Sequence, residues 1–319
     1  MSVNRGKVVI IGTSNVGSAV LNKIADFQLA SEIALIDLDM DRARGEALDT
    51  SHAMSSPYCT NIKIHPGTYE DCRDAAFIVI TAGPSILPGE TPDRLKLAST
   101  NSKIMRSIFS EIVKYTKDAM VIMITNPLDV ATYVVSTEFD YPRAKILGTG
   151  TMLETYRFRY ILAEHYAMDP KNIHGYVLGE HGNDAFVAWS TVNCAGLGID
   201  HLDEYFHFEK KLNRHDVEQG LIQTAYDVIN LKGFTNTGIA MVACRFIKAI
   251  LYNEHTILPC AAVMNGEYGM KDVALSIPRM ISQDGIVRSF EVHLTDDEMA
   301  KLQNAQKSVR AALDGAGVK

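Results

Sequence analysis

The chain has 319 residues, 47% of them hydrophobic, which is enough for a buried core and long enough for two domains. Its 31 basic and 38 acidic side chains give a formal net charge of −7, which argues against a nucleic-acid binder. Five scattered cysteines without a Cys-x-x-Cys pair predict reduced thiols, with neither a disulfide framework nor a metal site. The run Val8 to Ile11 is too short for a signal peptide and no apolar run reaches transmembrane length, so we expect a cytoplasmic protein without membrane contact.

The first half of the chain alternates short strands with helical segments. Continuous apolar, β-branched runs predict strands at residues 7–11, 33–36, 77–80, 120–124 and 145–147. Such runs suit strands that are buried on both faces, as in a parallel sheet. Helical periodicity lies between them, for example over 16–25 and 95–115. Repeated strand–helix units predict a doubly wound α/β domain with a parallel sheet.

The second half mixes helices and strands differently. We expect helices over 149–167, 216–229 and 239–251, and strands over 173–178, 185–192, 257–263 and 273–277. Thr295 and Glu298 form a Thr-x-x-Glu capping box that predicts the start of a final helix. This pattern predicts an α+β domain, and we place the domain boundary at Gly148, giving domains of residues 1–148 and 149–319.

The first strand runs directly into the segment Gly12-Thr13-Ser14-Asn15-Val16-Gly17. This is the Rossmann dinucleotide fingerprint with its first and third glycines present and Ser14 in place of the second. Gly12 permits the tight turn and Gly17 the close packing of helix on strand, so that the helix N-terminus faces a pyrophosphate. A glycine turn between strand and helix is common, so this segment alone is weak support for a cofactor site.

Asp37 strengthens that interpretation. It follows the second strand, twenty residues after Gly17, where a carboxylate accepts hydrogen bonds from the adenosine ribose hydroxyls. Such a carboxylate repels a 2′-phosphate, so the cofactor is predicted to be NAD rather than NADP. The alternative is that Asp37 is an ordinary turn residue at the end of a strand.

A candidate acid–base group lies in the segment Gly179 to Asn183, where His181 follows a strand in a glycine-flanked loop. Glu154 and Arg157 are three residues apart on the predicted helix and share one face, whereas Arg159 points to another side. A histidine can donate and accept the proton of a 2-oxo/2-hydroxy acid interconversion, a carboxylate can orient it, and a guanidinium can bind the substrate carboxylate. Taken alone, His181 could be a structural histidine and the Glu–Arg pair an exposed helix pair.

Seven motifs occur in one order along the chain. They are Gly12 to Gly17, Thr81-Ala82-Gly83, Pro88-Gly89-Glu90-Thr91, Thr125-Asn126-Pro127-Leu128-Asp129, Leu153 to Arg159, Gly179 to Gly182, and Lys232-Gly233-Phe234-Thr235. Together they resemble the L-lactate dehydrogenase family, including its L-2-hydroxyisocaproate branch, within the lactate/malate dehydrogenase superfamily. The resemblance covers nearly the whole chain.

The resemblance implies a role for each matching residue. His181 would be the proton donor and acceptor with Glu154 as its partner, Arg157 would bind the substrate carboxylate, and Arg94 would polarise the substrate carbonyl. Asn126 and Thr235 would contact substrate and nicotinamide, and the Asn126–Pro127 peptide bond would be cis. The NAD site would be lined by Gly12, Ser14, Asn15, Val16, Gly17, Asp37, Arg42, Tyr69, Gly83, Ser107, Asn126 and Thr149.

Three features depart from the family pattern besides Ser14. Glu154, one methylene longer, stands where the histidine's partner is normally Asp, so the helix or the histidine ring must shift to keep the hydrogen bond. The loop between Pro88 and Leu95 carries two extra residues, assigned to Pro92 and Asp93, on which the register of Arg94 depends. Ile86 occupies the specificity position that is usually Gln in lactate and Arg in malate dehydrogenases.

These observations predict an NAD-dependent oxidoreductase that reduces pyruvate or a related 2-oxo acid to the L-2-hydroxy acid, under a loop, Ile86 to Arg94, that excludes water. The alternatives are activity on larger branched 2-oxo acids, malate dehydrogenase, and a non-catalytic NAD-binding regulatory protein. The resemblance further implies a homotetramer in the pathway of glycolysis and pyruvate fermentation to lactate. Arg159 and His174 match a fructose 1,6-bisphosphate site of allosteric bacterial members; the alternative is an ordinary surface arginine and strand histidine.

Overall fold

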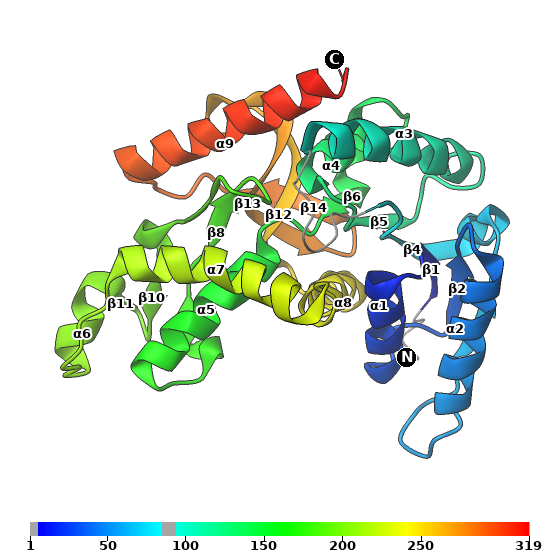
Figure 1. The fold of residues 1–319 in the computed structure, drawn as a ribbon, viewed down its shortest axis with the longest axis horizontal. Helices are drawn as coiled ribbons and strands as arrows, with labels where there is room; N and C mark the ends of the chain where they lie inside the picture. The colour runs from blue at the N-terminus through cyan, green and yellow to red at the C-terminus, as the bar shows by residue number, and fades with distance from the viewer. Residues whose placement is uncertain (1–5, 85–93, 319) are drawn as a thin grey trace.

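The computed structural model describes residues 6–84 and 94–318. Its first half is a parallel sheet in the order β3-β2-β1-β4-β5-β6, the strand order of a Rossmann domain (Figure 1). These strands are β1 (Lys7–Ile11), β2 (Glu32–Ile36), β3 (Lys63–Pro66), β4 (Ala75–Ile80), β5 (Met120–Met123) and β6 (Ile146–Gly148). The doubly wound fold expected from the apolar runs is therefore confirmed.

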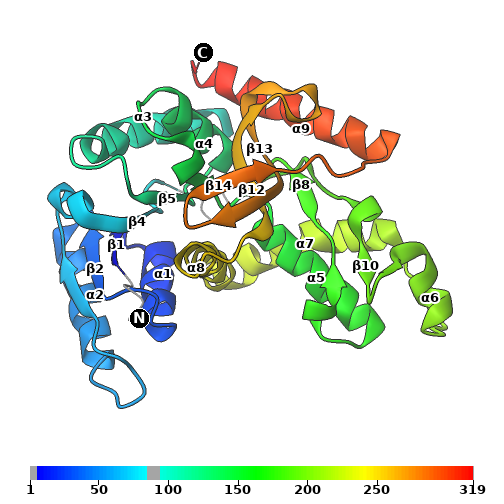
Figure 2. The ribbon, with the colours of Figure 1, turned by 180° about the vertical axis from the view of Figure 1, so that it is seen from behind.

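Helices cover both faces of this sheet because successive strand residues point to opposite sides. Val8 and Ile10 of β1 pack in one apolar core with α1, α2 and α8, whereas Val9 and Ile11 pack in another with α3 and α4. The two views of the ribbon show α1 and α8 side by side (Figures 1 and 2). These helices are α1 (Asn15–Asp26), α2 (Met40–Ala53), α3 (Arg94–Ile112), α4 (Leu128–Thr137) and α8 (Thr237–Leu251).

The second half extends the same sheet with antiparallel strands. Ala261 of β12 pairs with Gly148 of β6, and the order continues β12-β13-β8-β9, with β14 beside β13. The strands are β8 (Val177–Gly179), β9 (Ala185–Val187), β12 (Thr256–Asn265), β13 (Lys271–Ser282) and β14 (Gly285–Ser289). The accompanying helices are α5 (Met152–Tyr166), α6 (Leu202–Tyr205), α7 (Arg214–Lys232) and α9 (Asp296–Gly315).

Two of the strand predictions run beyond the observed strands, whereas β12 and β13 are longer than predicted. The segment 173–178 is not one strand, because Gly175, at φ 140°, separates β7 (Ile173–His174) from β8. A Cβ on Gly175 would lie 2.8 Å from Val192, so a side chain there would need a local shift. The segment 185–192 is strand only over β9 and then forms a 3₁₀ turn, Trp189–Thr191. β7 joins β10 (Asn193–Cys194) and β11 (Leu197–Gly198) in a separate small sheet.

The capping box at the last helix is confirmed. The Thr295 side chain accepts from the backbone N–H of Glu298, and the Glu298 carboxylate accepts from the N–H of Thr295.

Within the described ranges, no single helix is long and apolar enough to cross a membrane. Helices α7 and α8 have the necessary length and composition only as a pair, and that pair is bent by 118°.

Candidate active site

Two buried threonines fix helix α5 against strand β8. The Oγ1 of Thr151 donates a hydrogen bond of 2.5 Å to the carbonyl of Val177, and the N–H of Val177 donates to Oγ1 of Thr155 at 3.0 Å. One strand residue thus has both backbone groups bonded to the first two turns of the helix. This arrangement sets Glu154, on the same helix, against His181, which lies two residues beyond the end of β8.

The structure brings His181, Glu154 and Arg157 together. Nδ1 of His181 lies 3.3 Å from Oε1 of Glu154, and Nη1 of Arg157 lies 3.5 Å from the same oxygen. The contact with His181 is an ion pair by distance but is not aligned as a hydrogen bond, so among the described residues Nδ1 has no hydrogen-bond partner. All three side chains are largely buried, at 21, 12 and 14% exposed. The longer Glu154 therefore reaches its expected partner.

The charges of this cluster favour an imidazolium–carboxylate pair. Burial lowers the pKa of His181, but the carboxylates of Glu154 and Asp129 outweigh burial and raise it to about 9. Burial raises the pKa of Glu154, but His181 and Arg157 outweigh it, and the pKa lies below its ordinary value. At neutral pH the imidazole is therefore charged and ready to give up a proton.

Sequence reasoning missed two buried residues beside this cluster. Asp129, at the start of α4, accepts a hydrogen bond of 2.7 Å from the backbone N–H of His181. Asn101, on α3, donates from Nδ2 to the carbonyls of Pro84 at 3.2 Å and Asn126 at 2.5 Å. It thus ties together the loops that follow β4 and β5. Asp129 belongs to the segment Thr125 to Asp129, whereas Asn101 carried no sequence signal beyond an Asn on a predicted helix.

The remaining predicted substrate residues lie on separate segments. Asn126 is exposed after β5 and forms a cis peptide bond with Pro127, as the resemblance implied. Thr235 is partly buried in the turn between α7 and α8. Arg94 is the first residue of α3, and Ile86, like the rest of the segment 85–93, lies outside the described residues.

The glycine turn after β1 is a cradle that side chains would fill. Gly12 has φ 96°, which favours glycine, and a Cβ on Gly17 would lie 1.9 Å from the carbonyl oxygen of Gly12. Ser14 and Asn15 are exposed at the start of α1, and the Ser14 side chain makes no capping hydrogen bond. The helix N-terminus is therefore open to an anion, and these residues fit the pyrophosphate of a dinucleotide.

Asp37 lies at the end of β2 beside this turn. Its Oδ2 accepts from the N–H of Thr13 at 2.6 Å and from the Thr13 hydroxyl at 2.9 Å, and its Oδ1 accepts from the N–H of Asp39. Burial raises the pKa of Asp37, but these hydrogen bonds and Arg42 outweigh it and hold the pKa below its usual range. The carboxylate is therefore fixed and ionised where a ribose would bind.

Some of the predicted cofactor residues lie at the carboxyl edge of the parallel sheet, and others do not. Gly12, Asp37 and Thr149 come directly after a parallel strand, and Gly83 and Asn126 lie three residues beyond one, so all five lie near the carboxyl edge of the sheet, where open α/β sheets bind ligands. Thr149 is buried and donates to the carbonyl of Met123. The rest lie elsewhere: Val16 in the first turn of α1, Arg42 exposed on α2, Tyr69 at the start of a 3₁₀ helix, and Ser107 exposed on α3.

Comparison with known protein families agrees with this geometry. Residues 6–148 match the model described as lactate/malate dehydrogenase, NAD binding domain, and residues 151–317 match lactate/malate dehydrogenase, alpha/beta C-terminal domain. The chain belongs to the lactate/malate dehydrogenase family. As a member of this family it is an NAD-dependent oxidoreductase.

Individual members of the lactate/malate dehydrogenase family are similar over their whole length. The L-lactate dehydrogenase of Selenomonas ruminantium is 74% identical over 316 residues, which cover 99% of each chain. L-lactate dehydrogenase 2 of Clostridium acetobutylicum is 47% identical and covers 99% of this chain and 98% of its own. The crystal structure of a minor L-lactate dehydrogenase from Enterococcus mundtii in the ligands-bound form superposes with a TM-score of 0.90 at 36% identity, covering 97% of this chain and 98% of its own.

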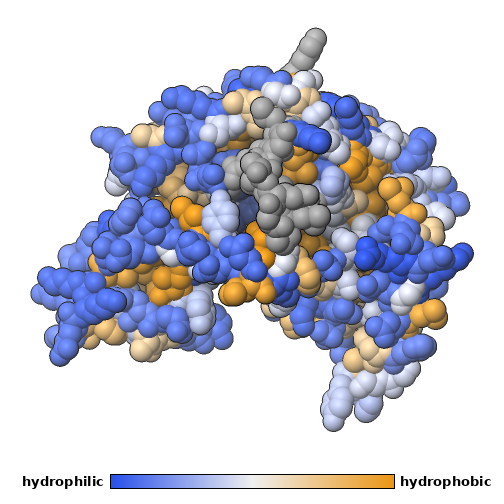
Figure 3. All heavy atoms as spheres, in the orientation of Figure 1, coloured by the Kyte–Doolittle hydropathy of each residue, from blue (hydrophilic) through white to orange (hydrophobic). Residues whose placement is uncertain are grey.

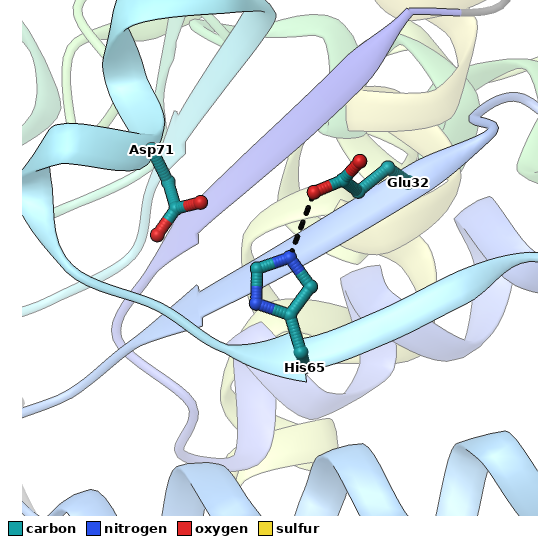
Figure 4. Close-up of side chains that lie close together, drawn as sticks. All are labelled: Glu32, His65 and Asp71. Carbon is teal, nitrogen blue, oxygen red and sulfur yellow. Dashed lines mark hydrogen bonds and ion pairs between the residues drawn. The ribbon is translucent and has the colours of Figure 1, made fainter.

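A second cluster of ligand-type side chains lies at the other end of the sheet. Glu32, His65 and Asp71 converge between β2, β3 and a 3₁₀ helix (Figure 4). The ammonium of Lys7 lies 3.5 Å from both Glu32 and Asp71, and Lys63 lies 3.1 Å from Glu32. Both ring nitrogens of His65 already face oxygen acceptors at 2.9 Å. These contacts account for the cluster as an ion-pair network without a metal ion.

Proposed function

We propose that this chain is an L-lactate dehydrogenase, which reversibly reduces pyruvate, or a closely related 2-oxo acid, to the L-2-hydroxy acid. The observation that carries the proposal is the shared Oε1 of Glu154, which contacts both His181 and Arg157. This places a proton donor next to a carboxylate-binding group. The names of the relatives at 74 and 47% identity support the same activity.

Each side chain has a distinct task in the proposed reaction. When bound, NADH supplies the hydride for the substrate carbonyl carbon. His181, charged at neutral pH, gives its Nε2 proton to the carbonyl oxygen, and Glu154 stabilises the imidazolium in both directions. Arg157 uses one nitrogen for Glu154, so further N–H donors of its guanidinium can bind the substrate carboxylate. Arg94 polarises the carbonyl.

The remaining contacts complete the proposed site. Asn126 and Thr235 contact substrate and nicotinamide, and the loop from Ile86 to Arg94 closes over them. In the domain division that we propose, residues 1–148 bind NAD and residues 149–319 bind the substrate. The limits of the two family matches, at 148 and 151, support this division.

The sequence favours a small apolar substrate side chain. Ile86, at the specificity position, offers no charge to the second carboxylate of oxaloacetate, and burial of an unpaired carboxylate costs several kcal/mol. An alkyl group gains about 0.8 kcal/mol for each buried methylene instead. Pyruvate and 2-oxobutyrate are therefore preferred over oxaloacetate, and branched 2-oxo acids are accepted at least weakly.

The proposed assembly is a homotetramer. Leu48 on α2 and Ile222, Tyr226 and Leu231 on α7 are large apolar side chains with exposed fractions of 42 to 88%. The face in Figure 3, which α7 crosses in Figure 1, is mainly hydrophilic with separate apolar patches. Such patches rimmed by polar groups are typical of subunit contacts. Light scattering on the purified chain measures the assembly directly, and a monomer would contradict this proposal.

Fructose 1,6-bisphosphate is the proposed activator. Arg159 lies on another side of α5 from Arg157 and donates to the carbonyl of Gly175, next to the exposed His174. Burial lowers the pKa of Arg159, and among the described residues its Nε has no hydrogen-bond partner. A phosphate there would supply the missing acceptor. Activation is measured at low pyruvate, and a rate that fructose 1,6-bisphosphate leaves unchanged rejects the site.

We place the enzyme in the cytoplasm, in glycolysis with fermentation of pyruvate to lactate.

A panel of 2-oxo acids tests the function. The loss of NADH absorbance is followed with pyruvate, 2-oxobutyrate, a branched 2-oxo acid and oxaloacetate, and chiral analysis identifies the product. His181→Gln should lose roughly 100- to 10,000-fold in turnover while it still binds NADH. A chain that binds NADH but oxidises it with none of these acids is a regulatory protein, and near-normal turnover in His181→Gln rejects the mechanism.

A further inference from the structure

Asp129 is a buried carboxylate that faces the catalytic loop from a different element than Glu154. It is 3% exposed in the first turn of α4, and its Oδ2 accepts the backbone N–H of His181, 52 residues away in sequence. Its second oxygen, Oδ1, is buried and has no hydrogen-bond partner among the described residues. The contact therefore joins the start of α4 to the His181 loop through a group that is costly to bury.

A hydrogen bond to one N–H does not by itself need a charge. A neutral amide would satisfy the same donor with less desolvation, and burial raises the pKa of Asp129 to about 7. The surrounding charges act in both directions. Glu154 on α5 and Glu180 beside His181 repel the carboxylate, whereas the imidazole and the buried Arg279 of β13 attract it.

The position of the carboxylate on α4 adds to this attraction. Asp129 is the acidic residue in the first turn of that helix, where the positive end of the helix dipole favours an anion. His181 thus contacts two carboxylates, Glu154 at Nδ1 of the ring and Asp129 at the backbone N–H, and Arg157 is the opposing cation.

We propose that Asp129 is a positioning residue for the acid–base step: it holds the His181 loop through the backbone N–H, and its charge, with that of Glu154, keeps the imidazole protonated. The proposal rests on the function proposed above. Glu154 orients the ring from one side, whereas Asp129 acts on the loop and through space. The effect of its charge is confined to neutral and alkaline pH, because at lower pH the carboxyl group itself takes up a proton.

Two substitutions separate the hydrogen bond from the charge. Asp129→Asn keeps an acceptor for the His181 N–H and removes the charge, whereas Asp129→Leu removes both. We expect Asp129→Asn to move the alkaline limb of kcat/KM for pyruvate reduction down by about 0.5 to 1 pH unit, with little change below that limb. Asp129→Leu should lose roughly tenfold or more in kcat at every pH because the loop is released.

A matched control removes an Asp charge from the first turn of another helix. Asp296→Asn on α9, where the side chain is exposed, should leave the pH profile unchanged. NADH binding and melting temperature are measured for each variant to show that it folds. If Asp129→Asn does not fold, Asp129→Ser, which also offers an acceptor, replaces it.

A second readout does not depend on turnover. NMR titration of the cofactor-free chain with labelled histidine, assigned through His181→Gln, gives the pKa of His181 directly. A lower pKa in Asp129→Asn supports the proposal, and an unchanged pKa or pH profile overturns the electrostatic part. Normal kcat in a folded Asp129→Leu overturns the positioning part. If wild type reduces no 2-oxo acid, the proposed function fails, yet the titration still decides whether Asp129 controls the imidazole.

Discussion

Replacing Glu154 by Gln removes the charge that contributes most to holding a proton on His181. The two groups lie 3.3 Å apart, and at an effective dielectric constant of about 20 Coulomb's law gives roughly 5 kcal/mol of gross attraction. Burial of the imidazole offsets part of that attraction. The rise in the pKa of His181 from 6.5 to about 9 corresponds to a net preference for the charged form of about 3 kcal/mol.

In Glu154→Gln, burial and Arg157 still disfavour the imidazolium, and among the described residues Asp129 remains to oppose them. We expect the pKa of His181 to fall by about two to three units. The protonated fraction that reduces pyruvate then drops about 30-fold at about pH 8, but changes little at about pH 6. The loss of turnover should follow this fraction, with a further few-fold loss at every pH because Gln orients the ring less well.

The assay is the pH dependence of kcat/KM in both directions. Reduction needs the charged imidazole, and oxidation of the 2-hydroxy acid needs the neutral one. In Glu154→Gln the alkaline limb of the reduction profile and the acid limb of the oxidation profile should therefore both move to lower pH. Glu138→Gln, which breaks a surface ion pair with Arg106, is the control for loss of a charge. An equal loss of reduction at about pH 6 and about pH 8 would refute the reasoning, because Glu154 would then act only by geometry.

Three further predictions concern other parts of the site. Gly17→Ala should abolish NADH binding or folding, measured by NADH fluorescence and melting, whereas Gly45→Ala on α2, where a Cβ meets nothing within 4 Å, should be neutral or stabilising. Asn101→Ala should lower kcat and destabilise the fold by about 1 to 3 kcal/mol, measured by urea titration, because two carbonyls lose their hydrogen-bond donor. An unchanged kcat would show that turnover does not need these hydrogen bonds. Ile86→Arg should raise the ratio of kcat/KM for oxaloacetate over pyruvate, and an unchanged ratio would place the specificity position elsewhere.

Much of the fold followed from local pattern in the sequence. Continuous apolar runs at β1, β2, β4 and β5 identified strands buried on both faces. Such strands have no solvent-facing side, so polar residues do not alternate with apolar ones along them. The Thr295 capping box located the start of α9 for a similarly local reason. The spacing of Glu154 and Arg157 on one helix face predicted their contact, because helix geometry alone places residues three apart together.

Other features depended on residues far apart in sequence. The segment 173–178 is divided between two sheets at Gly175, which lies against Val192, a neighbour that no local periodicity reports. Other contacts also join residues that are distant in sequence. Asp129 accepts a hydrogen bond from the N–H of His181, and Asn101 donates to the carbonyls of Pro84 and Asn126. The sequence by itself determined which residues can carry a charge, which can adopt a turn and which favour burial in the core. Only the tertiary structure decided which charges share a low-dielectric site, because the pKa of a group depends on its burial and on neighbours that the fold brings within a few ångströms.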